Sequence, residues 1–315
     1  VVASHSHPQI TKGGAEIAAH QLFWNLAARK DCDAYFLGCD RSVGGGRLGS
    51  VFAQPFSDRD YVYTTGEFDW FKFANRDPRF PVHFERLLRD LNPEVIHFHH
   101  YINFGVEVFH HVKRVLPHCG IVLTLHEYLG ICHNLGQMIT RPHRTLCHAA
   151  SEARCNVCFP EFSKSDFFLR KKYIMRFLDL VDEFIAPSRF LAERYTAWGI
   201  PPEKVRVIEN LIPEAPPART AHGHLRERPL RIGFFGQISA LKGINILLDA
   251  AQQLERSHPG EVLFEIFGEY RNQPEEFQKE FVERLDGLGA NVRFQGPYDE
   301  HRVDRLMQSV HTVIV

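Results

Sequence analysis

Short apolar runs alternate with amphipathic helical patterns along most of the chain. The clearest runs occupy residues 95–99, 120–125, 183–186, 205–208, 230–235, 262–267 and 291–294. Gly13 and Gly14 are expected to open a helix, and Ala18, Leu22 and Leu26 mark one face of it. Later helices are expected at 164–178, 243–256, 274–287 and 300–309. Strands that alternate with helices in this way predict an α/β fold with parallel, doubly wound sheets.

Two domains are predicted, because the composition changes at residues 213–229. This stretch holds four prolines and little apolar material, which is typical of an interdomain linker. We therefore predict a first domain at 1–212 and a second at 230–315. The chain does not begin with Met, and residues 310–315 have the pattern of a buried strand. Both ends are accordingly expected to be cuts, with the second domain incomplete.

Composition narrows the class of protein further. The 315 residues are 44% hydrophobic and 24% charged, with a net charge of −1, so no overall field favours nucleic acid as a partner. The chain shows no apolar run of membrane-spanning length and no signal peptide at its start. Its seven cysteines are an odd number, which argues against a secreted disulfide scaffold. A cytoplasmic protein is expected.

Two segments have the pattern of a phosphate site. Residues 12–16 read Lys-Gly-Gly-Ala-Glu, and residues 236–243 run from Gly236 to Lys242-Gly243; each lies between an expected strand and an expected helix. Glycines allow close approach of the backbone, and a helix N-terminus favours negative charge. Neither segment is a Walker A loop or a Gly-x-Gly-x-x-Gly turn. The alternatives are a tight strand-to-helix turn and a surface lysine beside a glycine.

The order of motifs resembles glycosyltransferase family 4 of the GT-B fold over most of the chain. The motifs are Gly-Gly-Ala-Glu at 13–16, a strand ending in Leu-His at 125–126, Pro-Ser at 187–188, Ile-x-Asn at 208–210 and Phe-Gly-Gln-Ile-x-x-x-Lys-Gly at 235–243. The resemblance implies two Rossmann-like domains. It also implies a retaining transfer from a nucleoside diphosphate sugar to a hydroxyl of a polysaccharide, glycolipid or other glycan, with no cofactor for catalysis.

The resemblance also implies roles for particular residues. His126 matches the cleft histidine of the family, and Lys242 matches the lysine that holds the donor diphosphate; these two are the expected catalytic residues. The expected donor-binding residues are Gly13, Gly14, Gly236, Gln237, Lys242 and Gly243.

Two features depart from the family pattern. Gln237 stands where the family usually has arginine, and the Glu-x7-Glu motif that grips the donor would lie beyond Val315. Alternatives therefore stay open: a non-catalytic module that binds a sugar nucleotide or a glycan, or a related GT-B epimerase or phosphorylase.

A long cysteine-containing loop is expected at residues 127–162. Its cysteines follow the pattern Cys-x14-Cys-x7-Cys-x2-Cys at Cys132, Cys147, Cys155 and Cys158. Four thiolates with a closing Cys-x2-Cys resemble a structural zinc site, which would order a loop too polar to form its own core. Free or disulfide-forming cysteines are the alternative. Histidines in the loop could also replace a ligand; they are His133, His143 and His148.

Three further features have mainly structural interpretations. Asp-Arg-Asp at 58–60 looks like the metal motif of other glycosyltransferases, but it sits in a polar stretch, so we expect a chance match. Of His97, His99 and His100, at least two are expected to be half-buried or solvent-facing. The basic, aromatic helix expected at 164–178 could lie on an anionic membrane that holds a lipid-linked acceptor. More often such a helix packs its apolar side on a sheet and exposes its lysines.

Overall fold

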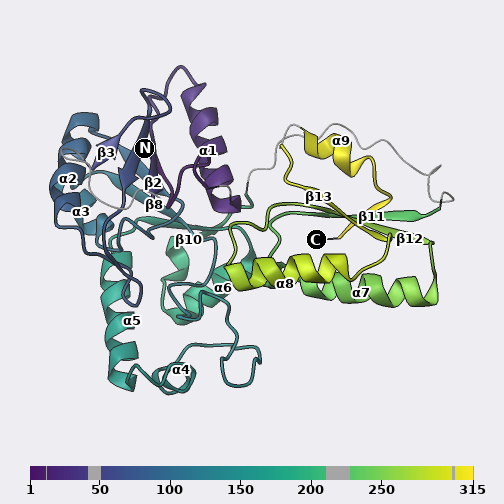
Figure 1. Cartoon of the computed structure of the whole chain (residues 1–315). Coiled ribbons are helices and arrows are strands. Elements are labelled where there is room, and N and C mark those ends of the chain that lie inside the picture. Colours follow the sequence, from purple (N-terminus) through teal and green to yellow (C-terminus); the bar gives the residue numbers. More distant parts are fainter. Residues whose placement is uncertain (12, 42–50, 211–227, 300–301, 315) are drawn as a thin grey trace. The chain divides into compact units, whose positions relative to one another are not determined.

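The computed structural model describes residues 1–11, 13–41, 51–210, 228–299 and 302–314 (Figure 1). The chain divides into two compact units, Val1–Leu211 and Ile212–Val315. Lys12 of the first glycine motif and residues 213–227 of the predicted linker lie outside the described residues, so the predictions for them stay untested.

The first unit contains a mostly parallel sheet. Its strands are β1 (Val2–Ala3), β2 (Phe36–Asp40), β3 (Phe52–Ala53), β4 (Asp60–Thr64), β7 (Val95–Phe98), β8 (Gly120–Thr124), β9 (Glu183–Ala186) and β10 (Val205–Val207). They lie in the order β10-β9-β8-β7-β1-β2-β4-β3, and β3 pairs antiparallel with β4. A separate antiparallel pair is formed by β5 (Phe68–Asp69) and β6 (Ala74–Asn75).

Helices cover both faces of this sheet (Figure 1). The helices of the first unit are α1 (Gly14–Ala27), α2 (Arg79–Leu91), α3 (Val108–Val115), α4 (Glu152–Cys158), α5 (Lys164–Leu178), α6 (Arg189–Trp198) and the short 3₁₀ helix η1 (Pro202–Lys204). Of these, α4 buries none of its residues and lies beside α5, away from the sheet (Figure 1). Side chains alternate between the two faces of a strand. Val2 of β1 accordingly belongs to the small apolar cluster that includes Phe23 of α1, whereas Ala3 joins the large core with α2 and α3.

Local sequence sets several helix ends. Ser188 caps α6, because its hydroxyl accepts a hydrogen bond of 3.2 Å from the Leu191 amide. Ser163 and Asp166 form a reciprocal capping box at the start of α5.

The large core holds many fully buried aromatic rings, and each contributes about 1.5–3 kcal/mol by leaving water.

The second unit contains a smaller, fully parallel sheet. Its strands are β11 (Leu230–Phe235), β12 (Val262–Phe267), β13 (Val292–Gly296) and β14 (Thr312–Ile314), in the order β13-β12-β11-β14. Its helices are the 3₁₀ helix η3 (Ala240–Lys242), α7 (Ile244–Ser257), α8 (Glu275–Asp286) and α9 (Val303–Met307). The alternation of strands and helices predicted from the sequence is confirmed.

The end of the described chain differs from the expectation. The strand expected to be buried at 310–315 is β14, the last strand in the order of its sheet, and Ile314 is 38% exposed. Helix α9 (Val303–Met307) ends before residue 309, where the prediction put its end, and residues 300–301 of that prediction lie outside the described residues. Among the described residues, no helix combines the length and the apolar character needed to cross a bilayer.

Candidate functional site

Ionisable side chains gather where neighbouring strands of the first sheet end. His5 follows β1, His100 follows β7, and Glu127 follows β8, while Glu16 joins them from the first turns of α1. His5 Nε2 lies 3.1 Å from Glu16 Oε1, and His100 Nε2 lies 2.9 Å from Glu127 Oε1. The carboxyl ends of parallel strands meet at one edge, where open α/β sheets bind ligands. This edge is the candidate site of the first unit.

His126, the predicted catalytic histidine, lies within this group. Its Nε2 is 3.1 Å from Nδ1 of His99, and its ring stacks on that of His99. Next to it along the sheet, His97 Nε2 contacts the Thr124 hydroxyl at 2.7 Å. His99 and His100 are each only 5% exposed, so the expectation that at least two of the three histidines would be half-buried or solvent-facing was wrong. The cause is the position of these residues at the end of a central strand.

Burial decides the charge of these histidines. It lowers the pKa of His126 to about 4 and that of His97 to about 4, and the neighbouring histidines add to the effect. The same burial lowers the pKa of His99 to about 2. All three are therefore neutral at pH 7 and act as hydrogen-bonding groups. Nε2 of His99 is buried without a hydrogen-bond partner in the structure.

A hollow of about 640 Å³ opens beside this group within the first unit. Its lining residues are His5, Ser6, Ile10, Thr11, Glu16, Arg41, Trp70, Ile102 and Asn103. The guanidinium of Arg41 lies over the Trp70 ring, 4.8 Å from its centre. A flat aromatic side chain with several hydrogen-bonding groups suits a polar ring such as a sugar. His126 lies outside this lining.

The first glycine motif lies at the same edge. Gly13 is the N-cap of α1, and Gly14 is its first residue. A Cβ added at Gly13 would lie 2.5 Å from Glu16 Oε2, so the carboxylate occupies the place of a side chain there. The sequence motif contained Glu16 and predicted no role for it. The structure shows that the Glu16 carboxylate lies against Gly13 and also contacts His5.

The carboxyl edge of the second sheet has a different chemistry. After β11 the chain passes Gly236 and the exposed Gln237, then forms η3, which ends at the exposed Lys242. Gly243 has φ +73° and is the N-cap of α7. A helix N-terminus with a lysine beside it favours an anion. His126 and Lys242 belong to different units, and the catalytic and donor-binding roles remain predictions.

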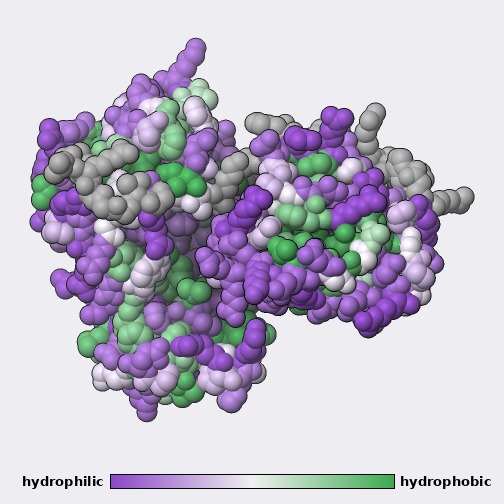
Figure 2. All heavy atoms as spheres, viewed as in Figure 1, coloured by the Kyte–Doolittle hydropathy of each residue, from purple (hydrophilic) through white to green (hydrophobic). Residues whose placement is uncertain are grey.

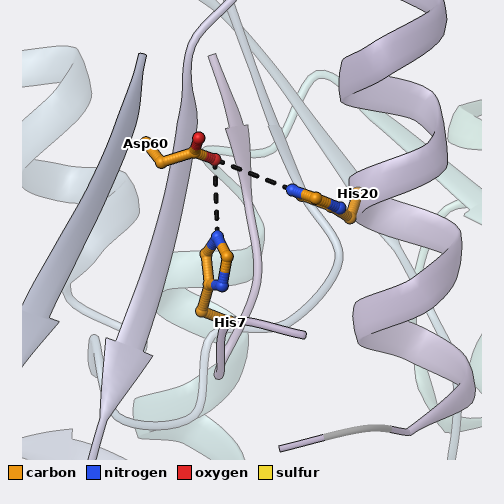
Figure 3. Close-up of side chains that lie close together, drawn as sticks. All are labelled: His7, His20 and Asp60. Carbon is orange, nitrogen blue, oxygen red and sulfur yellow. Dashed lines mark hydrogen bonds and ion pairs between the residues drawn. The ribbon is translucent and has the colours of Figure 1, made fainter. Parts of the chain in front are cut away.

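A third group of polar side chains lies between α1 and the sheet (Figure 3). Asp60 Oδ1 is 3.4 Å from His7 Nε2 and 3.7 Å from His20 Nε2. The Asp-Arg-Asp motif was expected to be a chance match in a polar stretch, but Asp60 is buried and begins β4. Among the described residues, this is the group of three possible metal ligands whose donor atoms all lie within 4.8 Å of one another.

The hydrogen bonds of His7 favour a hydrogen-bonded cluster over a metal site. The Gln9 amide donates to His7 Nδ1 at 3.1 Å, so in the neutral ring the proton is on Nε2, which faces Asp60. A metal on Nε2 would need that nitrogen free and a proton on Nδ1 instead. Ser57 also donates a hydrogen bond to Asp60. His7 and His20 thus hold the first loop and α1 against β4.

The predicted zinc ligands converge without forming disulfides. Cys132, Cys147, Cys155 and Cys158 all line one cavity of about 30 Å³. His133 lines it too, whereas His143 and His148 do not. The donor atoms of His7, His20 and Asp60, called the His7 group below, all lie within 4.8 Å of one another, and among the described residues the cysteine sulfurs form no group of three that does so. Burial raises the pKa of Cys155 to about 11.

The comparisons with known proteins agree with this fold. The sequence profile of glycosyltransferase family 4 matches residues 12–215. The two parallel α/β sheets define a GT-B type of protein, and the chain belongs to glycosyltransferase family 4. No curated protein matches the chain.

Several solved structures share the fold. HepE of Anabaena in complex with UDP and glucose matches with a TM-score of 0.59 and 17% identity, over 99% of this chain and 73% of that one. The lipopolysaccharide outer core galactosyltransferase WaaB matches with a TM-score of 0.52 and 13% identity, over 99% and 72%. The UDP-GlcNAc 2-epimerase of Neisseria meningitidis, bound to UDP-GlcNAc, matches with a TM-score of 0.53 and 11% identity, over 99% and 76%.

Proposed function

We propose that this protein is a retaining glycosyltransferase that moves a hexosyl or pentosyl group from a nucleoside diphosphate sugar to a hydroxyl of a glycan or a lipid-linked acceptor. The observation that carries the proposal is the carboxyl edge of the second sheet. There a glycine turn, an exposed lysine and the N-terminus of α7 occur within eight residues, 236–243. This combination suits a diphosphate leaving group, whose charge grows as the glycosidic bond breaks.

The first unit would supply the sugar and acceptor side of the reaction. Its hollow carries Trp70, Asn103 and the His5–Glu16 pair, which offer both a stacking surface and hydrogen-bond partners. His126 would act as a neutral hydrogen-bonding group that orients the sugar or the acceptor. Lys242 and the backbone amides of 236–243 would hold the diphosphate. Retention of the anomeric configuration follows the family resemblance.

Two alternative functions are each supported by one specific observation. The epimerase structure bound to UDP-GlcNAc shares the fold, so a reaction that inverts a sugar centre is the first alternative. Gln237 in place of the usual arginine motivates the second, a module that binds a sugar nucleotide or glycan without turnover. An epimerase and a sugar-nucleotide-binding module would both bind a nucleotide sugar, so binding of the donor alone does not separate them from a transferase.

A panel of nucleotide sugars, followed by proton NMR, separates the three functions. A transferase releases the nucleoside diphosphate and, with a suitable acceptor, forms a glycoside with the donor's anomeric configuration. An epimerase changes the coupling constants of the sugar ring without needing an acceptor. A binding module shifts the nucleotide signals and produces neither change. Product with an inverted anomeric centre would contradict retention but not transfer.

We also propose that the first unit contacts the inner face of a membrane in the cytoplasm. A hollow of about 600 Å³ is lined by Lys171, Lys172 and Arg176 together with Phe168 and Trp198, among others. Helix α5 buries Phe167, Ile174 and Leu178, yet its Phe168 is 48% exposed and its Leu169 57% exposed. Apolar residues are also visible at the surface of the part of the first unit where α4 and α5 lie (Figure 2).

Vesicle sedimentation tests the contact. Lys171→Glu/Lys172→Glu should weaken binding to vesicles containing phosphatidylglycerol, because each basic residue near an anionic surface contributes about 1 kcal/mol. Lys279→Glu on α8 of the second unit is the matched control. Equal binding to neutral and anionic vesicles would contradict the proposal.

A further inference from the structure

We infer that Cys132, Cys147, Cys155 and Cys158 bind one structural zinc ion that holds the segment 132–158 together. The inference is independent of the proposed function, because it rests on the packing of this segment alone. Four protein ligands leave no open position for a water molecule, so the ion would have no part in catalysis.

The four cysteines come from three separate pieces of backbone. Cys132 lies in the loop after β8, Cys147 follows an antiparallel bridge between Ile139 and Leu146, and Cys155 and Cys158 lie on α4. All four line the same small cavity. Folding therefore brings together residues up to 26 positions apart (132 to 158), as a structural zinc site requires.

Backbone hydrogen bonds fix the turn that carries Cys132. The Cys132 amide donates to the Tyr128 carbonyl at 2.7 Å, and the Gly136 amide donates to the Cys132 carbonyl at 3.1 Å. The Cys147 amide in turn donates to the Met138 carbonyl at 2.7 Å, which places Cys147 beside this turn. The backbone thus holds two of the four cysteines beside the same turn.

The segment buries little apolar surface. No residue from 139 to 162 is buried, although this stretch contains α4 and the 139–146 bridge. Its beginning is anchored by the buried Arg170, which donates to the carbonyls of Leu129 and Gly130 at 2.8 Å each. Its end is held by Phe162, which stacks on Phe71 with ring centres 4.0 Å apart. Between these two anchors, little apolar surface leaves water to offset the entropy of ordering the backbone. A metal ion bound by the four cysteines would supply the remaining free energy that orders the segment.

The sulfurs must move closer together to bind an ion. A tetrahedral zinc site has zinc–sulfur distances of about 2.3 Å. The cysteines do not meet the 4.8 Å spacing, but all four lie in the lining of one cavity. A change of side-chain rotamer moves a sulfur without moving the backbone. The cavity of about 30 Å³ leaves little room for anything larger than a single ion.

Metal analysis of the whole protein tests the inference. Protein purified under reducing conditions, without added metal or chelator, should contain close to one zinc ion per chain. Cys155→Ser/Cys158→Ser should lose that zinc and become more sensitive to proteases within 139–162. Cys32→Ser/Cys119→Ser is the matched control, since neither cysteine lines the cavity, and it should keep the zinc.

Two further measurements keep the test decisive if the double variant fails to fold. Cobalt exchanged into the wild-type protein should show the absorption of a tetrahedral thiolate site. His20→Ala/Asp60→Asn should leave the zinc content unchanged. If the zinc is lost in His20→Ala/Asp60→Asn and kept in Cys155→Ser/Cys158→Ser, the ion is bound by the His7 group and the inference is overturned. Metal-free wild-type protein with an equally protease-resistant segment, or with fewer than seven free thiols, would overturn it as well.

Discussion

The two sheets carry opposite kinds of chemistry at their carboxyl edges. The first edge holds histidines and carboxylates that are buried or half-buried, and His97, His99 and His126 are neutral there because burial lowers their pKa. The second edge holds two glycines and the exposed Lys242. A buried neutral group gives direction to a hydrogen bond, whereas backbone amides and a lysine give positive potential. The difference suits a division of labour in which the first unit orients the reacting groups and the second stabilises the charge.

The largest effect is expected from the second edge. Lys242→Ala should lower turnover of the donor by about 10²–10³, because one preorganised donor to the developing charge is lost. Steady-state kinetics with saturating donor measure the change. Lys279→Ala, an exposed lysine paired with Glu283 on α8, is the control and should leave turnover unchanged. Near-normal turnover in Lys242→Ala would remove this residue from the mechanism.

A smaller effect is expected at the first edge. His126→Ala should lower turnover by about ten- to a hundredfold, the size expected for one hydrogen bond of about 1.5–3 kcal/mol to a charged group. Affinity for UDP, measured by calorimetry, should stay unchanged because the residue would face the sugar. The control is His118→Ala, an exposed histidine outside the group. Parallel losses of turnover and UDP affinity would make His126 a structural residue.

Acid should destabilise the first unit in particular. The unfolded chain binds protons on His97, His99 and His126 near pH 6.5, whereas the folded pKa values are about 4, about 2 and about 4. Between pH 6.5 and 4 the unfolded state therefore holds more protons, and stability falls as the pH falls. We expect a loss of about 1 kcal/mol per buried histidine between pH 7 and 5.5.

Tryptophan fluorescence reports on this unit alone, because all three tryptophans lie within residues 1–211. Urea midpoints at the two pH values measure the loss. His97→Gln should weaken the dependence on pH, since it removes one of the histidines whose pKa is lowered in the folded unit. An unchanged midpoint between pH 7 and 5.5 would show that the three histidines take up protons in the folded protein.

The smallest effect concerns backbone geometry at the second edge. Gly243→Ala should destabilise the second unit by about 1–2 kcal/mol, because φ +73° lies in the left-handed region that a side chain disfavours. Hydrogen exchange in β12 measures the change. Gly287→Ala is the matched control, since φ is −82° there. Equal effects of the two substitutions would mean that the conformation of Gly243 carries no special cost.

Much of the second unit followed from local sequence. The apolar runs 230–235 and 262–267 match β11 and β12 residue for residue, and the glycine–lysine segment falls between a strand and a helix as predicted. These features depend on short-range patterns of side chains. Strands β2 and β4 of the first sheet had no such prediction, although they pair along five residues each.

The amino-acid sequence by itself determined the alternation of strands and helices, the glycine turns and the order of motifs that marks the family. These depend on neighbours in the chain, whose spacing is fixed by the periods of strand and helix. Only the tertiary structure decided that Asp60 meets His7 and His20, that Glu16 reaches His5, and that four cysteines share one cavity. Such contacts join residues far apart in the chain, and they arise because parallel packing brings the ends of separate strands and loops to the same place.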